Sequence, residues 1–431
     1  MKVIILHYHL NPGGVTRIVE SQVKGLETVA GDMEITILSG HEGATPGISG
    51  VSAGVHTSLY YQFPESQHIN QHEERRIIVS YIKGHLSPDT ILHCHNANLG
   101  KNPAFSAAVF QLAGEGYGIV NHCHDFPEDR PENFAFLEKV IAGSFGIRLE
   151  TLLYPNLPRY HFITLNSCDH KRILQHGVPA ERIHLLPNPV VMHKMTGNGK
   201  YEKDRYDITR ALELDASKKI CTYPVRAIRR KNIGEFLLLA AVFEKQASFI
   251  LTQPPKNPAE LPGYARWKYF SKLIGLDVKY EAGEAVNHEM LIRVSDFCIT
   301  TSYREGFGMT YLEPWITGTP VIGRNLECIT EDLKQFGLVF PGLYSAIWIK
   351  THSGFTDFKD LTPEEQEKQI AAVKENPVEC NRLLSDNPFL NSLLAPVSPE
   401  IINKNRGIIE KKFTVKKYGE KLFAIYKAIS G

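Results

Sequence analysis

The sequence is poor in cysteine and has no Cys-x-x-Cys pair. Its seven cysteines are scattered over 431 residues. This spacing indicates neither a disulfide framework nor a zinc ribbon. The distribution fits a reducing compartment, so the sequence predicts a cytoplasmic protein.

Long apolar runs and an excess of charge are also missing. Residues 1–7 contain a four-residue apolar run, which is too short for the core of a signal peptide. No stretch approaches the ~18 apolar residues of a membrane span. The 48 basic and 47 acidic side chains favour neither a nucleic-acid partner nor a strongly anionic membrane. We predict a soluble protein without a transmembrane segment, and peripheral membrane contact is left open.

What the chain does have is length and a recurring strand, turn and helix pattern. A chain of 431 residues is too long for one ordinary core, so two domains, or three, are expected. Residues 193–215 are polar and lack apolar periodicity, which predicts a linker. A first domain would then cover residues 1–192 and a second residues 216–411. Residues 403–429 show long helical periodicity, and the alternation as a whole predicts an α/β fold.

The most informative stretch is residues 296–322. An apolar strand pattern over 296–301 is followed by the turn Glu305-Gly306-Phe307-Gly308, and a helix is predicted over 309–316. Ligands of open α/β sheets bind where strands end and helices begin, and helix N-termini favour phosphate. Glu305 in the turn and Glu313, one turn into the helix, indicate a ligand with hydroxyls and phosphates, such as a nucleotide sugar. Solvated surface charges are the alternative for both glutamates.

A similar strand, turn and helix unit opens the chain. Apolar residues 3–6 are followed by Gly13-Gly14 and a helical pattern over 15–26. The glycine pair suits close approach of the backbone to a phosphate or sugar. It lacks the Gly-x-Gly-x-x-Gly spacing of dinucleotide-binding proteins. A tight turn with positive φ explains the two glycines equally well.

A basic turn follows the apolar run of residues 219–225. It contains Arg226, Arg229, Arg230 and Lys231, and a helical pattern begins at residue 233. Cations beside a helix N-terminus suit a diphosphate. A solvated basic loop is the alternative.

Two His-x-His pairs lie on strand patterns. His93 and His95 belong to the run 90–96, and His122 and His124 belong to the run 118–126. Alternation along a strand places the members of each pair on one face. This geometry raises a metal hypothesis, but Asp125 is the one obvious carboxylate beside them, so no metal site is predicted.

In their order along the chain, these motifs resemble the retaining glycosyltransferases of family 4. Residues 305–322 are similar to that family's Glu-x7-Glu signature, and the matching positions are Glu305, Gly306, Phe307, Gly308, Glu313, Gly318, Pro320, Val321 and Ile322. The chain departs from the family at Pro314, where alanine is usual and where proline is expected to kink the helix. The resemblance covers about residues 1–340 and the terminal helix.

The resemblance implies a GT-B fold, in which two facing Rossmann-like domains enclose a cleft and a C-terminal helix, here about 412–431, crosses back to the first domain. It implies a retaining enzyme of carbohydrate biosynthesis that moves a hexosyl group from a nucleotide diphosphate sugar to an acceptor hydroxyl, without a metal or other cofactor. The resemblance also implies roles for particular residues. Arg226 and Lys231 would bind the diphosphate, Glu313 the ribose, and His124, ahead of His122, the transferred sugar. Gly13 and Gly14 would lie beside the diphosphate and acceptor, and the sugar and diphosphate would contact Glu305, Gly306, Phe307, Gly308, Met309 and Thr310.

Two alternatives to this function stay open. One keeps the fold but acts as a disaccharide phosphorylase or a nucleotide-sugar hydrolase, and the other is a non-catalytic regulator that binds a sugar nucleotide. The balanced charge and the lack of a basic amphipathic helix favour a soluble carbohydrate or small molecule as acceptor.

Overall fold

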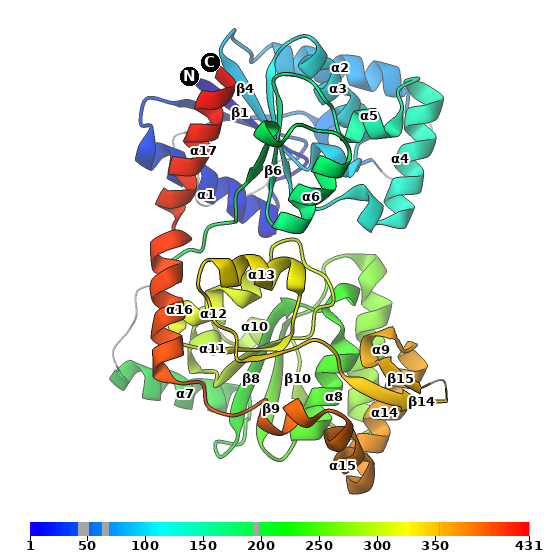
Figure 1. Cartoon of the computed structure of the whole chain (residues 1–431), viewed down its shortest axis with the longest axis vertical. Coiled ribbons are helices and arrows are strands. Elements are labelled where there is room, and N and C mark those ends of the chain that lie inside the picture. Colours follow the sequence, from blue (N-terminus) through cyan, green and yellow to red (C-terminus); the bar gives the residue numbers. More distant parts are fainter. Residues whose placement is uncertain (42–50, 63–68, 193–197, 353, 431) are drawn as a thin grey trace. The chain divides into compact units, whose positions relative to one another are not determined.

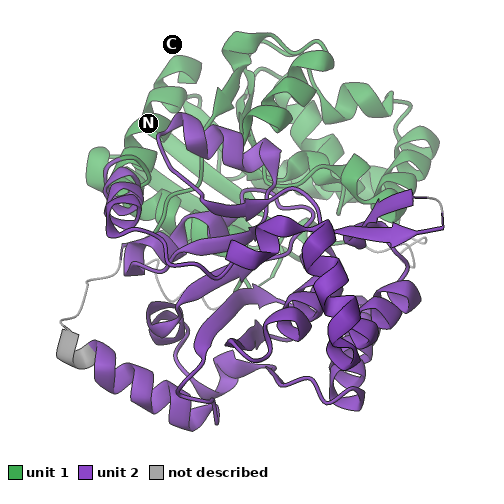
Figure 2. Ribbon diagram, turned by 60° about the horizontal axis from the view of Figure 1, so that its bottom comes forward, with its two compact units in different colours: residues 1–190, 412–431 green, residues 191–411 purple. Residues whose placement is uncertain are grey.

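The computed structural model describes residues 1–41, 51–62, 69–192, 198–352 and 354–430 (Figure 1). These residues form two compact units, coloured separately in Figure 2. Unit 1 comprises Met1–Val190 and Lys412–Gly431, and unit 2 comprises Val191–Lys411. Each unit has a parallel sheet with helices packed against it, so the predicted α/β class is confirmed.

Unit 1 is built on a seven-stranded parallel sheet in the order β3-β2-β1-β4-β5-β6-β7. Its central strands are apolar runs that are buried on both faces, as parallel strands require. The strands are β1 (Lys2–His7), β2 (Glu34–Ser39), β3 (Ser52–Val55), β4 (Thr90–His95), β5 (Gly118–Cys123), β6 (Tyr160–Thr164) and β7 (Ile183–Leu185).

Helices cover both faces of this sheet. Side chains of α1 and α17 pack on the face that carries Val3 and Ile5, and those of α2, α3, α4, α5 and α6 pack on the face that carries Ile4 and Leu6. The helices are α1 (Gly14–Val29), α2 (Gln71–Lys83), α3 (Pro103–Gly114), α4 (Pro131–Ser144), α5 (Leu149–Leu153), α6 (Ser167–Gln175) and α17 (Val415–Ser430).

The segment from residue 412 onward returns to unit 1, as the resemblance implied. Helix α17 lies beside α1, red beside blue in Figure 1. The two helices meet at a pair of glycines, where a Cβ on Gly419 would lie 2.3 Å from the carbonyl oxygen of Gly25. This distance is shorter than any non-bonded contact allows, so the packing of α17 on α1 requires glycine at position 419.

Unit 2 has a six-stranded parallel sheet in the order β10-β9-β8-β11-β12-β13 and a separate antiparallel hairpin. The strands of the sheet are β8 (Lys219–Arg226), β9 (Ala247–Gln253), β10 (Val278–Lys279), β11 (Phe297–Thr300), β12 (Val321–Arg324) and β13 (Gly342–Tyr344), and those of the hairpin are β14 (Trp348–Thr351) and β15 (Gly354–Asp357).

One of the helices of unit 2 lies where the sequence predicts a linker. The helices of this unit are α7 (Asn198–Ala211), α8 (Ile233–Phe243), α9 (Leu261–Leu273), α10 (Ala282–Ala285), α11 (His288–Val294), α12 (Glu313–Thr317), α13 (Glu327–Gln335), α14 (Pro363–Glu375), α15 (Pro377–Asp386) and α16 (Pro399–Lys412). Helix α7 lies in the predicted linker 193–215, of which residues 193–197 are outside the described residues. It packs on unit 2 because Ile208 and Leu212 are buried against Leu291 and Val294 of α11.

No helix in the described ranges has both the length and the hydrophobicity that spanning a bilayer demands.

Candidate functional site

The basic turn of unit 2 joins the end of β8 to the start of α8. Arg226 is the last residue of β8, and a short 3-10 helix spans Arg229–Lys231. Asn232 then adopts the left-handed conformation with φ 50°, which asparagine tolerates. The hydroxyl of Thr301 donates to the carbonyl oxygens of Lys231 (2.9 Å) and Asn232 (3.1 Å). The residue that follows β11 therefore holds the basic turn in place.

Glu305 lies against this turn. Its carboxylate accepts hydrogen bonds from Lys231 Nζ, from Arg230 Nη1 at 2.8 Å and from Ser302 Oγ at 2.6 Å. The Glu305 side chain is 7% exposed and that of Lys231 9%. The structure thus brings together Glu305 and Lys231, which are 74 positions apart in the chain. It adds Arg230, which the family resemblance did not select.

Burial and charge act in opposite directions on this pair. Burial favours the neutral acid, but the charges of Lys231 and Arg230 outweigh it, so the pKa of Glu305 lies below its ordinary value. Burial lowers the pKa of Lys231, and the Glu305 carboxylate partly offsets that effect. Glu305 is therefore an anion at neutral pH, and two cations face it.

The glycine-rich turn continues directly from Glu305. Gly308 has φ 76°, and a Cβ there would lie 2.8 Å from the ring of Tyr311. Both facts require glycine. Residues Met309–Tyr311 form a 3-10 helix, and Thr310 and Phe307 are buried. The predicted continuous helix over 309–316 is wrong in detail, since α12 begins only at Glu313.

Glu313 is the first residue of α12 and not one turn into a helix. Pro314 lies in the first turn of α12. Backbone N–H groups in the first turn have no acceptor within the helix, so the missing N–H of proline breaks no helical hydrogen bond there. The expected kink at Pro314 is therefore absent, and the proline marks the start of α12. Gly318 ends α12 in the left-handed conformation, with φ 87°.

In unit 1, Gly13 and Gly14 stand at the start of α1. Gly13 is the N-cap with φ −171°, and Gly14 is the first helical residue. Neither has a positive φ, so the alternative of a turn that needs positive φ is wrong. Among the described residues, no atom outside the neighbouring backbone would lie within 4 Å of a Cβ at Gly14. Gly14 thus adds no side-chain bulk at the N-terminus of a 16-residue helix, where backbone N–H groups favour an anion.

Strand alternation predicted that each His-x-His pair shares one face, and in the structure the two pairs also contact each other and form one cluster. His93, His95 and His122 have no exposed surface, and His124, the first residue after β5, is 8% exposed. His93 Nε2 lies 3.2 Å from His122 Nδ1, and His95 Nδ1 lies 2.9 Å from His124 Nε2. Burial lowers the pKa of His93 to about 3 and that of His124 to about 4. The cluster is therefore neutral at physiological pH.

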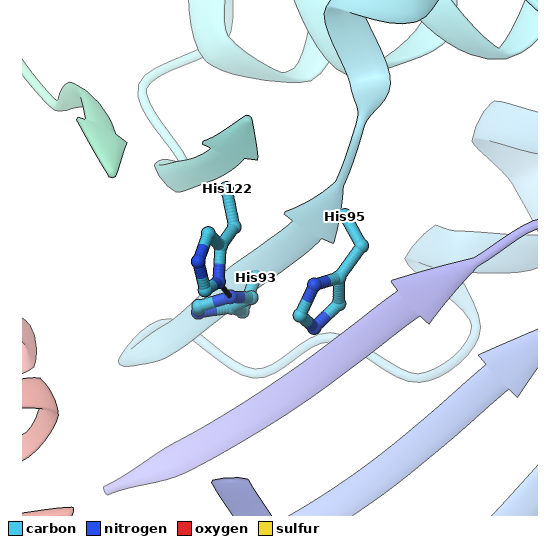
Figure 3. A group of neighbouring side chains, drawn as sticks. All are labelled: His93, His95 and His122. Atoms are coloured by element: carbon cyan, nitrogen blue, oxygen red, sulfur yellow. Dashed lines mark hydrogen bonds between the residues drawn. The ribbon is translucent and has the colours of Figure 1, made fainter. Parts of the chain in front are cut away.

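The arrangement of three of these rings bears on the metal hypothesis. Figure 3 shows His93, His95 and His122 turned toward one another, and their ligand nitrogens all lie within 4.8 Å of one another. No carboxylate belongs to this group among the described residues. The rings instead hydrogen-bond to each other and to neighbouring side chains.

The segment after His124 is more ordered than the loop predicted over 126–134. Residues Pro127–Asp129 form a 3-10 helix, and α4 starts at Pro131. Asp125 accepts a hydrogen bond from Arg130 at 3.1 Å. Arg172 pairs with both carboxylate oxygens of Asp129 at 3.2 Å. The charges of this segment are thus largely paired within unit 1.

Comparisons with known proteins found a curated relative and solved structures of similar fold. No model of a known protein family matches the chain. A curated relative, mannosylglucosyl-3-phosphoglycerate synthase of Petrotoga mobilis, is 29% identical over 349 residues, which are 77% of this chain and 66% of the relative. The match thus spans slightly less than two thirds of that relative's length.

Solved structures match nearly the whole chain. HepE of Anabaena in complex with UDP-glucose is 15% identical with a TM-score of 0.62, and 99% of this chain and 100% of HepE are covered. Sucrose-phosphate synthase of Thermosynechococcus elongatus is also 15% identical, with a TM-score of 0.61 and coverage of 99% and 98%. At these identities the likeness is one of fold.

Proposed function

From the GT-B glycosyltransferase fold that this chain has, we propose that it is a glycosyltransferase that moves a hexosyl group from a nucleotide diphosphate sugar to an acceptor hydroxyl, with retention at the anomeric carbon. The observation that carries the proposal is the contact of Glu305 with Lys231 and Arg230. This contact brings together an anion that suits sugar hydroxyls and cations that suit phosphate, where β8 and β11 end.

The diphosphate gains charge as the glycosidic bond breaks. Groups that stabilise this charge more in the transition state than in the ground state accelerate the reaction. Arg226, Arg230 and Lys231 supply positive charge in the proposal, and the backbone amides of Gly308 to Thr310 supply donors. Because these groups would stabilise the charge of a diphosphate, we propose that no metal is required. Activity that EDTA leaves unchanged would support this part of the proposal, and activity that EDTA abolishes would contradict it.

Positioning of the sugar is the second requirement. Glu305 is ionised and accepts hydrogen bonds, so it suits sugar hydroxyls, and Glu313 is assigned to the ribose. His124 contacts the transferred sugar in this scheme, and Gly13 and Gly14 leave room beside the diphosphate and acceptor. No side chain of the proposed site is assigned as a covalent nucleophile, so the acceptor attacks on the face that the diphosphate leaves, and the diphosphate takes the acceptor's proton.

The acceptor is proposed to be a small soluble molecule. The name of the curated relative describes a glycoside of 3-phosphoglycerate, which supports a small acceptor for this chain as well. A cytoplasmic location stays a prediction.

Two experiments test the function. Calorimetry with UDP-, GDP- and ADP-glucose should reveal one preferred donor, and product analysis with and without inorganic phosphate separates transfer from phosphorolysis and hydrolysis. Glu305→Ala and Lys231→Ala should each leave the chain folded but lower transfer by at least about a hundredfold, as loss of a transition-state contact does. Normal turnover in both variants would remove the proposal. Donor binding without turnover in the wild-type chain would favour the non-catalytic regulator.

A further inference from the structure

Six buried side chains of unit 1 form one continuous chain of hydrogen bonds. They come from β4, β5, the residue after β5, α1 and α17, and in order they are His124, His95, Gln22, Tyr426, His93 and His122. The successive distances are 2.9, 2.9, 2.8, 2.8 and 3.2 Å. All six side chains are at least nine-tenths buried.

The amide of Gln22 determines which group donates and which accepts along this series of hydrogen bonds. An amide oxygen only accepts and an amide nitrogen only donates. Gln22 Oε1 faces His95 Nε2, so His95 donates from Nε2. Gln22 Nε2 faces the Tyr426 hydroxyl, so that hydroxyl accepts from the amide and donates its own proton to His93 Nδ1.

The direction of these hydrogen bonds determines which nitrogen of His124 carries the proton. A neutral imidazole has one N–H donor and one acceptor nitrogen. Because His95 donates from Nε2, its Nδ1 must accept, and the hydrogen-bond donor to it is His124 Nε2. Nδ1 of His124 is then the acceptor nitrogen. In the part of the chain that the structure describes, no hydrogen bond to this Nδ1 is formed, and His124 alone among the four clustered histidines reaches the surface.

We propose that Gln22 and Tyr426 are positioning residues that hold His124 with its proton on Nε2, so that Nδ1 accepts a hydrogen bond from a hydroxyl of the substrate. The inference rests on the proposed function and deepens it. A lone pair on a neutral ring recognises a hydroxyl donor, and it repels the oxygens of a phosphate or carboxylate. His124 therefore accepts a hydrogen bond from a hydroxyl of the sugar or acceptor and does not bind the diphosphate. Burial, which lowers the pKa of His124 to about 4, keeps the ring neutral.

The tautomer can be observed without any substrate. Long-range 1H–15N correlation spectra of the full chain labelled with [15N]histidine distinguish a protonated from an unprotonated ring nitrogen. The His124 signals are identified by their loss in a His124→Gln variant. We expect a protonated Nε2 and an unprotonated Nδ1 in the wild-type chain. A protonated Nδ1 would overturn the proposal, whatever the enzyme's activity.

A pair of matched variants on α17 tests the positioning role. Tyr426→Phe removes a hydroxyl of the hydrogen-bonded chain, whereas Tyr418→Phe removes a buried hydroxyl that has no hydrogen-bond partner among the described residues. Tyr426→Phe should lower kcat/KM roughly tenfold, the scale of one hydrogen bond. It should also show His124 signals of both tautomers, because the Gln22 amide is then free to turn.

Tyr418→Phe should keep the wild-type rate and the wild-type spectrum. The rate assay uses UDP-glucose or the donor preferred in the calorimetric screen. If Tyr426→Phe matches Tyr418→Phe in rate and spectrum, the positioning role is wrong. If the wild-type chain transfers no sugar from any donor, the proposed function is wrong, and the spectrum still decides the tautomer. If Tyr426→Phe does not fold, the wild-type spectrum alone decides.

Discussion

Mild acid should unfold unit 1 before unit 2. Five buried histidines lie on or just after β1, β4 and β5, and they are His7, His93, His95, His122 and His124. Burial lowers the pKa of each below the ordinary value of 6.5. The described histidines of unit 2, His288 and His352, are not buried to this degree. Acid therefore acts selectively on unit 1.

The sign and size of the effect follow from proton linkage. A histidine with a folded pKa of about 3 or 4 and an unfolded pKa of 6.5 gains its proton only on unfolding between these values, so stability falls as the pH falls below 6.5. At pH 5 each such histidine favours the unfolded state by about 2 kcal/mol. His7, His93 and His124 together then contribute about 6 kcal/mol, which is comparable with the whole stability of roughly 5–15 kcal/mol of many domains.

Tryptophan fluorescence distinguishes the unfolding of unit 2 from that of unit 1. The three tryptophans, Trp267, Trp315 and Trp348, all lie in unit 2, so their fluorescence reports unit 2, whereas far-UV circular dichroism reports both units. Urea titrations at pH 7.5 and pH 5 should show a dichroism transition that moves to much lower urea at pH 5 and precedes the fluorescence transition. If the dichroism midpoint is the same at both pH values, the buried histidines are not neutral in the folded state and the reasoning is refuted.

Two further predictions concern single contacts. Lys231→Met removes one of the cations that pair with the buried Glu305 carboxylate, and it should lower the free energy of unfolding reported by tryptophan fluorescence by about 3 kcal/mol. Lys334→Met, which removes an exposed ion pair, should change this free energy little. Equal losses of stability in the two variants would contradict the burial argument. Gly419→Ala puts a Cβ against the carbonyl oxygen of Gly25 and should lower the dichroism melting temperature. In the control variant Gly407→Ala in α16, the new Cβ has no neighbour within 4 Å among the described residues, and the variant should be more stable than the wild-type chain by roughly 0.5–1 kcal/mol. Equal melting temperatures of the two variants would contradict the close crossing of α1 and α17.

The sequence predicted most of the sheet strands because parallel strands are continuous apolar runs. The patterns at 3–6, 90–96, 118–126 and 219–225 correspond to β1, β4, β5 and β8. The pattern failed at α7, because Asp204 and Ile208 are the buried residues among those that the structure describes in this helix, and a largely exposed helix has the composition of a polar linker. It also failed at Pro314, because whether a proline breaks or begins a helix depends on where the helix starts.

The candidate site was predicted unevenly for a related reason. Lys231 and Glu305 belong to recognisable motifs, so their proximity was expected. Ser302 and Arg230 complete the carboxylate's surroundings, and their proximity depends on how β8 and β11 pair. Alternation along the strands placed the histidines on common faces. The roles of Gln22 and Tyr426 depend on two helices 404 positions apart meeting, and no local pattern carries that information.

The discontinuous composition of unit 1 has a consequence for biosynthesis. Residues 412–431 complete the hydrophobic layer on one face of the sheet, yet they leave the ribosome after all of unit 2. Until then Val19, Val23 and Leu26 of α1 lack the apolar partners that α17 provides. A chain truncated after residue 411 should therefore fold unit 2 but hold an incomplete unit 1 that depends on chaperones.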